Sequence, residues 1–212
     1  MNICAAPNDL TAAATIRETA MRLFAERGAA AVTIRDVAAE AGVSPSLVIH
    51  HYGSKEGLKA AVDERATALV ETFVKELTEH AGGGGAATSL AAAFSQQIER
   101  EPVLPSYLRR LLVEGGPAAD GLFRTLFEAT RSGLASLESE GLVRATADAD
   151  VRAAFLLVND LAVVLLRDQL RSVLAVDPLT PAGTERWTAQ ILDTYARGVF
   201  VLPAETSGEG LR

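Results

Sequence analysis

The sequence has 212 residues, of which 49% are hydrophobic and 22% charged, the composition of a globular protein with room for two domains. Its single cysteine, Cys4, excludes an intramolecular disulfide and a thiolate metal cluster. Residues 1–10 carry no secretion signal, and the most apolar stretch, 153–166, is shorter than the roughly 20 residues of a membrane span. We therefore expect a soluble, cytoplasmic protein with no membrane partner.

The net charge of −7 is unevenly distributed along the chain. Residues 1–60 contain six basic and six acidic side chains, whereas the remaining 152 residues contain 14 basic and 21 acidic ones. A neutral segment can still bind phosphate if its cations share one face. The acidic total therefore does not exclude a nucleic-acid partner.

Apolar residues recur at intervals of three and four along most of the chain and strand-like alternation is nearly absent, so the predicted fold class is all-α. Gly28 ends a first helix, and Thr33 caps a second one. Gly42 then turns the chain, and Ser44 followed by Pro45 begins a third helix. The breaks that follow predict helices over residues 45–52, 55–80, 88–100, 105–114, 118–140, 148–174 and 181–200.

Three short helices with a tight corner between the second and third have the dimensions of a helix-turn-helix. Residues 33–58, TIRDVAAEAGVSPSLVIHHYGSKEGL, preceded by LFAERG at 23–28, resemble the DNA-binding domain of TetR-type repressors. The resemblance covers roughly residues 11–60, and the later helices resemble the family only in length and all-α character. It implies an N-terminal three-helix DNA-binding domain (1–58) joined to a larger helical ligand-binding and dimerisation domain (59–202), followed by a disordered tail (203–212).

The resemblance also assigns the contacts to DNA. Thr33 would meet a phosphate, and Arg35 would reach a phosphate or a base edge, since its fork matches O6 and N7 of guanine. Lys55 matches the phosphate-binding lysine of the family, although it could be merely a solvated lysine. Tyr52 is interpreted as a core residue between the third and fourth helices rather than a base stacker. The predicted DNA-binding residues are Thr33, Arg35, Ser44, Pro45, Ser46, Leu47, Ile49, His50, His51 and Lys55.

In the third helix, the predicted recognition helix, Ser46 and Leu47 are the expected direct readers of the major groove. Ile49 departs from the family, which usually has tyrosine there, so an apolar contact such as one to a thymine methyl replaces the phenolic one. His50 and His51 suggest a metal pair, but adjacent residues on a helix diverge by about 100° and no third ligand is nearby. We therefore predict no metal site.

The C-terminal region shows no set of catalytic residues. Its histidine lacks an evident nucleophile partner, and no Gly-rich phosphate loop follows a strand. We expect no enzymatic activity and no cofactor, although a helical enzyme and a constitutive architectural DNA-binding protein remain alternatives. The large apolar C-terminal domain argues against the architectural protein.

Aromatic residues in the C-terminal helices could line a cavity for a small lipophilic effector, although aromatics at helical spacing more often form core. Asn159 and the Tyr107 hydroxyl are the candidate polar contacts to this effector. The alternative for Asn159 and its neighbour Asp160 is that they face solvent or pair across a dimer interface. The predicted ligand-binding residues are Phe73, Phe94, Tyr107, Leu111, Phe123, Phe127, Phe155 and Asn159.

The resemblance further implies a homodimer formed by the last two long helices, 148–174 and 181–200. Each has enough apolar residues for a four-helix interface. The predicted interface residues are Ala154, Leu157, Leu161, Val164, Leu165, Trp187, Ile191, Leu192 and Tyr195. The implied function is a repressor that binds a palindromic double-stranded operator and leaves it when effector binding changes the distance between its two DNA-binding domains.

Overall fold

The computed structural model describes the backbone of residues 7–80 and 96–197 and the side chains of 11–76 and 96–197. Every regular element within these ranges is a helix, which confirms the all-α prediction. The predicted tail, 203–212, lies outside the described residues.

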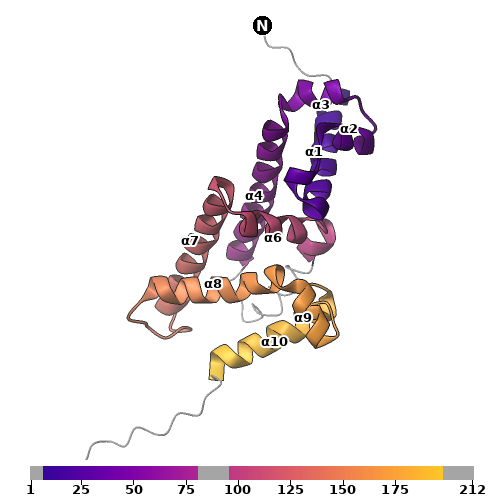
Figure 1. Cartoon of the computed structure of the whole chain (residues 1–212). Helices are drawn as coiled ribbons and strands as arrows, with labels where there is room; N and C mark the ends of the chain where they lie inside the picture. Colours follow the sequence, from indigo (N-terminus) through magenta and orange to yellow (C-terminus); the bar gives the residue numbers. More distant parts are fainter. Residues whose placement is uncertain (1–6, 81–95, 198–212) are drawn as a thin grey trace, which may run out of the picture.

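The N-terminal helices form one end of the molecule (Figure 1). They are α1 (Pro7–Arg27), the 3₁₀ turn η1 (Ala29–Ala31), α2 (Ile34–Ala41) and α3 (Pro45–Tyr52). Gly28 ends α1 with φ 82°, in the positive range that glycine adopts without strain. The predicted ends of these helices are confirmed, because each depends on local capping residues.

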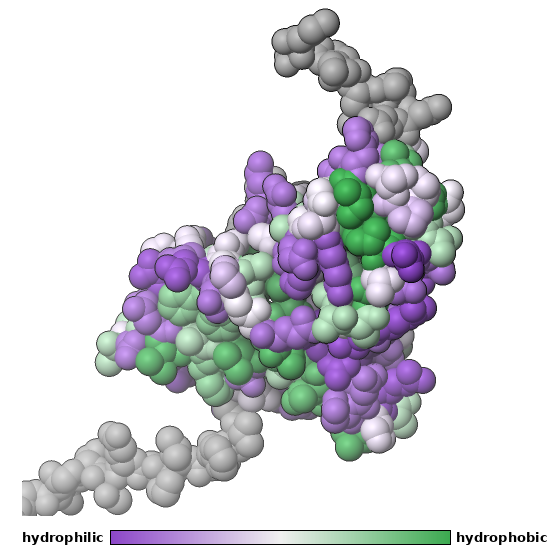
Figure 2. All heavy atoms as spheres, turned by 45° about the horizontal axis from the view of Figure 1, so that its top comes forward, coloured by the Kyte–Doolittle hydropathy of each residue, from purple (hydrophilic) through white to green (hydrophobic). Residues whose placement is uncertain are grey.

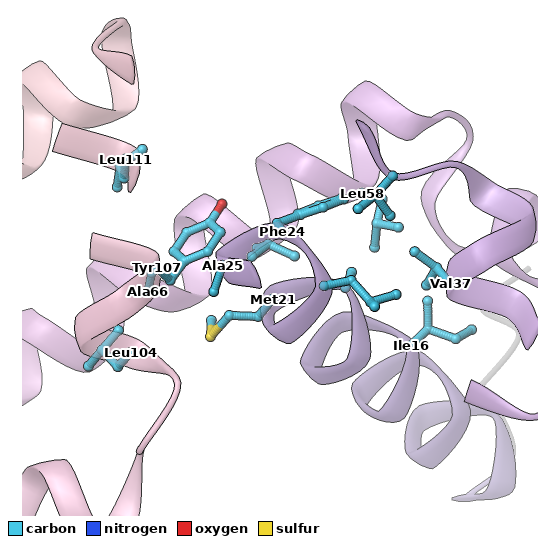
Figure 3. Packing of buried hydrophobic residues seen from close by; sticks show 14 of the residues in the cluster. Ile16, Met21, Phe24, Ala25, Val37, Leu58, Ala66, Leu104, Tyr107 and Leu111 are labelled. Carbon is cyan, nitrogen blue, oxygen red and sulfur yellow. The ribbon is translucent and has the colours of Figure 1, made fainter. Parts of the chain in front are cut away.

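Helix α4 (Lys55–His80) runs from this end into the body of the molecule, where it meets α6 (Leu104–Glu114) and α7 (Pro117–Ser139) (Figure 1). Residues 96–100 are also helical. One hydrophobic core joins the N-terminal helices to α4, α6 and α7. In Figure 3, Tyr107 of α6 lies beside Ala25 of α1. The two predicted domains therefore share packed side chains.

The predicted helix 148–174 is wrong as a single element. It divides into α8 (Ala149–Leu165) and α9 (Arg167–Leu174), and Leu166 between them leaves the helical conformation with φ −108° and ψ 23°. No proline or glycine marks this break. The guanidinium of Arg167 instead forks onto Asp177, with distances of 3.0 and 2.6 Å to the two carboxylate oxygens. This tertiary ion pair follows the turn and holds α9 in place.

The last described helix is α10 (Pro181–Arg197), and its predicted continuation to residue 200 lies outside the described part. Gly183 allows α10 to pass the preceding turn, because a Cβ at this position would lie 1.9 Å from the carbonyl oxygen of Asp177.

Figure 2 shows hydrophobic residues exposed among hydrophilic ones on both the upper and lower parts of one face. Among the residues described, no helix is long and apolar enough to cross a membrane.

Candidate nucleic-acid interface

The start of α2 is fixed by a reciprocal cap between Thr33 and Asp36. The Asp36 amide donates to the Thr33 hydroxyl at 3.2 Å, while the Thr33 amide and hydroxyl donate to the Asp36 carboxylate at 2.8 and 2.7 Å. These bonds lower the pKa of Asp36. The Thr33 hydroxyl is therefore already used in this cap, and a phosphate contact would have to compete with it. Arg35, two residues further along, is exposed.

The corner between α2 and α3 is built by backbone geometry. Gly42 adopts a left-handed conformation (φ 70°, ψ 30°), and the Val43 amide donates to the carbonyl of Ala38 at 2.9 Å. Ser44 then caps α3 by accepting a 3.2 Å bond from the amide of Leu47. Because the bonds are local, the capping residues in the sequence were sufficient to predict this corner.

Helix α3 presents a short exposed surface and buries the opposite side. Val48 is fully buried in the core, and Leu47 packs partly against the same core. Ser46 and His50 are exposed, as is Ile49 with 44% of its surface accessible. Leu47 is half-buried, so the prediction that it reads bases directly stays a prediction, while Ser46, Ile49 and His50 are the more exposed residues of α3.

Tyr52 and Lys55, which follow this surface in the sequence, connect it to the rest of the N-terminal helices. The hydroxyl of Tyr52 donates to the carbonyl of Ala13 in α1 at 2.6 Å, so Tyr52 packs against α1 as well as within the core. The ammonium group of Lys55 donates to the carbonyl of Ala30 in η1 at 3.2 Å. Sequence reasoning missed this bond, which sets the position of Lys55 at the start of α4.

The paired histidines lie next to each other at the end of α3. Their rings lie edge to face with centroids 5.4 Å apart, and His51 is half-buried. In the part of the chain that the structure describes, no group of three or more His, Cys, Asp or Glu side chains could hold a metal ion. The exposed side chains of this surface include hydroxyl, imidazole and guanidinium groups and the apolar side chain of Ile49.

Family models match both parts of the chain. The model described as "Bacterial regulatory proteins, tetR family" matches residues 16–62, and "Tetracyclin repressor-like, C-terminal domain" matches 99–201. Over 151 residues the chain is 35% identical to the HTH-type transcriptional regulatory protein RaaS of Mycobacterium tuberculosis. This alignment covers 71% of this chain and 68% of RaaS. The chain belongs to the TetR family. It is a DNA-binding transcriptional regulator of that family.

Solved structures of other TetR-like regulators have the same fold. The complex of SmeT with triclosan matches with a TM-score of 0.64 and 21% identity, over 95% of this chain and 99% of SmeT, the repressor of a Stenotrophomonas maltophilia multidrug efflux pump. FadR of Bacillus subtilis with stearoyl-CoA matches with a TM-score of 0.68 and 12% identity, over 88% of this chain and 99% of FadR. At these identities the likeness shows the fold alone.

Those residues predicted to line an effector cavity that the structure describes do not surround a common cavity. Tyr107 and Leu111 are buried in the core against α1 and α4. The Tyr107 hydroxyl donates to the carboxylate of Asp63 at 2.6 Å, so it is already used within the protein. Phe123 is exposed on α7, and Phe155 is 62% exposed on α8. Phe155 therefore does not line an enclosed cavity here.

The other predicted ligand residues lie apart from these. Phe73 and Phe127 are half-buried, and the Asn159 amide donates to the carbonyl of Phe155 in its own helix at 2.9 Å. Phe94 lies outside the described residues. A cavity of about 10 Å³ lies between α1, α4 and α6, lined by Phe24, Ala29, Lys59, Tyr107, Arg110, Leu111 and Glu114. A cavity that holds a drug-sized ligand has about 300–1,000 Å³, so this one cannot contain the effector.

The predicted dimer residues differ in how far they are buried within the single chain. Leu157 and Val164 are buried within the chain, whereas Leu161, Leu165, Trp187 and Ile191 are half-buried and Tyr195 is exposed. A different stripe on α8 is open to solvent. Its residues Val151, Phe155 and Val158, at intervals of four and three, are 63%, 62% and 54% exposed. Periodicity predicted a helix here, but it did not show which of its apolar residues face inward.

Proposed function

We propose that this TetR-family regulator is a homodimeric repressor that binds a palindromic operator and is released by a small lipophilic effector. The observation that carries the proposal is the pairing of two surfaces on one chain. The exposed side of α3 offers Ser46, Ile49 and His50 to a DNA groove, and α8 offers an apolar stripe to a second copy. We place the division between DNA-binding and effector parts at residue 58.

The DNA contacts are proposed from exposure and chemistry. Arg35 carries the fork that pairs with guanine, and Ser46 lies in the first turn of α3, where free backbone amides favour phosphate. Ile49 offers an apolar side chain that fits a thymine methyl. Lys55 lies at the start of α4, held beside η1 by its bond to Ala30.

Replacing Lys55 by alanine should weaken binding to every DNA sequence alike, because a phosphate contact carries no sequence information. The slope of log affinity against log salt should become shallower by about one unit. Arg35→Ala should also relax the preference for the selected base. Fluorescence anisotropy over a salt series with selected and mutated duplexes measures both effects.

Arg124→Ala is the control for these variants. It removes one cation from the exposed surface of α7 and should leave affinity unchanged. If Lys55→Ala behaves like Arg124→Ala in both affinity and salt slope, Lys55 does not bind phosphate.

The homodimer is proposed from the exposed stripe on α8 and from exposed apolar residues on α10. Leu192 and Tyr195 of α10 are also exposed, and partial burial followed by the nearby carboxylate of Asp160 on α8 raises the pKa of Tyr195. Both helices thus carry exposed apolar residues. A patch of this kind on a monomer marks an interaction surface, and a two-fold axis through it would pair identical helices.

The effector is proposed to be lipophilic and to bind among the C-terminal helices. Solved structures of SmeT and FadR, which share this fold, are complexes with triclosan and with stearoyl-CoA, respectively. The cavity of about 10 Å³ between α1, α4 and α6 is too small for either molecule. We therefore expect the effector to bind elsewhere among the C-terminal helices, and a movement of these helices on binding is the proposed link to the DNA-binding part.

An effector of this kind must obey thermodynamic linkage. If it lowers operator affinity about a hundredfold, the operator must lower effector affinity by the same factor, roughly 2.7 kcal/mol. Triclosan, stearoyl-CoA and a lipophilic library can be screened by thermal shift, and each binder titrated by calorimetry with and without the operator. A binder with equal affinity in both titrations does not control DNA binding. If no binder in the library shows linkage, effector control of this chain is rejected for the lipophilic class.

A further inference from the structure

We propose that Arg110 is a positioning residue for operator binding, because it fastens α6 to the end of α1 and so fixes the orientation of the N-terminal helices on the effector domain. This proposal rests on the proposed function in one respect, namely that two such N-terminal units bind one palindrome. It assigns a role in DNA binding to a side chain that lies outside the DNA-binding part.

The contact joins segments that are far apart in the sequence. The Nε atom of Arg110 donates to the carbonyl of Ala25 at 2.6 Å, and one terminal nitrogen donates to the carbonyl of Glu26 at 2.8 Å. Both carbonyls belong to the last turn of α1, where backbone oxygens lack partners within the helix. A cation there is also favoured by the helix dipole.

The planar fork of the arginine determines this geometry. Two donors on one rigid group bind two successive carbonyls, so the contact restrains rotation as well as distance. Gly28 makes room for it, since a Cβ at that position would lie 3.1 Å from Nη1 of Arg110. The glycine that ends α1 thus also admits the guanidinium.

A second polar contact ties α6 to α4 one turn earlier. The Tyr107 hydroxyl donates to Asp63 at 2.6 Å, and Lys59 donates to both oxygens of the same carboxylate at 3.1 and 2.8 Å. Burial, and then the bond to Asp63, raise the pKa of Tyr107, so it remains a neutral donor. Figure 3 shows Tyr107 entering the core that α1 and α4 share.

The two contacts together bind α6 to α1 and α4, the helices against which α2 and α3 pack. Arg110 holds the end of α1, and Tyr107 holds α4 two turns after its start. A palindrome requires the two reading surfaces to lie at a fixed separation and rotation, one helical turn of DNA or a multiple apart. Loosening α6 should therefore broaden the range of half-site spacings that the dimer accepts.

The test uses the full-length protein and three duplexes. The first is a palindrome selected from random DNA with the wild-type protein, and the others have one base pair added or removed between its half-sites, a rotation of roughly 35°. Arg110→Met should lose about tenfold in affinity for the selected palindrome, as expected for losing a charged hydrogen bond. It should also discriminate less between the three spacings.

Arg109→Met is the matched control. Arg109 is the neighbouring residue on α6 and is exposed, and its ion pair with Asp168, at 3.5 Å, joins it to α9 rather than to α1. This variant loses the same charge and should keep the wild-type spacing preference. Arg110→Lys, which keeps the charge and can reach one carbonyl, should recover part of the discrimination lost in Arg110→Met. Tyr107→Phe, which loses the bond to Asp63 but keeps Arg110, should retain part of the wild-type discrimination.

The possible results distinguish a failure of the proposed function from a failure of the role proposed for Arg110. If the wild-type protein selects no palindrome, the proposed function fails before this inference is tested. If it does, and Arg110→Met keeps the wild-type spacing preference, Arg110 is not a positioning residue. A merely destabilised variant would lose affinity equally on all three duplexes. If Arg110→Met does not fold, the spacing preference of Arg110→Lys decides, and a preference identical to that of the wild type overturns the proposal.

Discussion

Replacing Gly57 by alanine is expected to destabilise the protein and to abolish operator binding. Gly57 lies in the first turn of α4, and a Cβ there would be 2.1 Å from the carbonyl oxygen of Tyr52, the last residue of α3. Because the obstacle is backbone, the α3–α4 corner must move to admit one methyl group. The expected cost is about 1–3 kcal/mol in the free energy of unfolding, the range for overpacked sites.

Gly133→Ala provides the matched control. Gly133 lies within α7, and a Cβ there would meet nothing within 4 Å. Alanine in an open helical position should raise the free energy of unfolding by about 0.5–1 kcal/mol. Urea unfolding and operator anisotropy on both variants make the comparison. If Gly57→Ala is as stable as Gly133→Ala and still binds the operator, the α3–α4 corner does not depend on this close approach.

The features that could be predicted from the sequence depend on neighbouring residues. Thr33, Gly42 and Ser44 act on amides and carbonyls within a few residues, so the ends of α2 and α3 were predicted correctly. The break at Leu166 was missed because the ion pair beside it joins Arg167 to Asp177, ten residues away. No local signal distinguishes that arginine from a solvated one.

The distance in sequence between contacting residues also explains why the surroundings of the site residues could not be predicted. Helical periodicity showed that Tyr107 and Phe155 lie on apolar helices, but not which neighbours they meet. In the structure, Tyr107 is bonded to Asp63, 44 residues earlier, while Phe155 is open to solvent. Arg110 carried no sequence signal at all, since its partners are backbone carbonyls 84 and 85 residues away. A single sequence contains no information about such pairings.

Replacing Val158 by aspartate is expected to convert the protein to a monomer that no longer binds the palindrome tightly. Val158 is 54% exposed in the single chain and lies between Phe155 and the end of α8, so the substitution should leave the fold of the chain intact. In a two-fold dimer each substitution occurs twice, on facing surfaces. An unpaired carboxylate buried at such an interface should raise the dimer dissociation constant at least about a hundredfold.

Val113→Asp tests whether the effect belongs to the stripe on α8. Val113 is 73% exposed on α6, so its replacement adds the same charge at an exposed site outside the proposed interface. Sedimentation velocity at several micromolar concentrations should show a dimer for the wild type and for Val113→Asp, and a monomer for Val158→Asp. Operator affinity should follow the same order, because one reading surface alone contacts half of a palindrome. A Val158→Asp protein that sediments as a dimer would place the interface elsewhere. A wild-type protein that sediments as a monomer and still binds a palindrome would show that operator binding does not require a dimer.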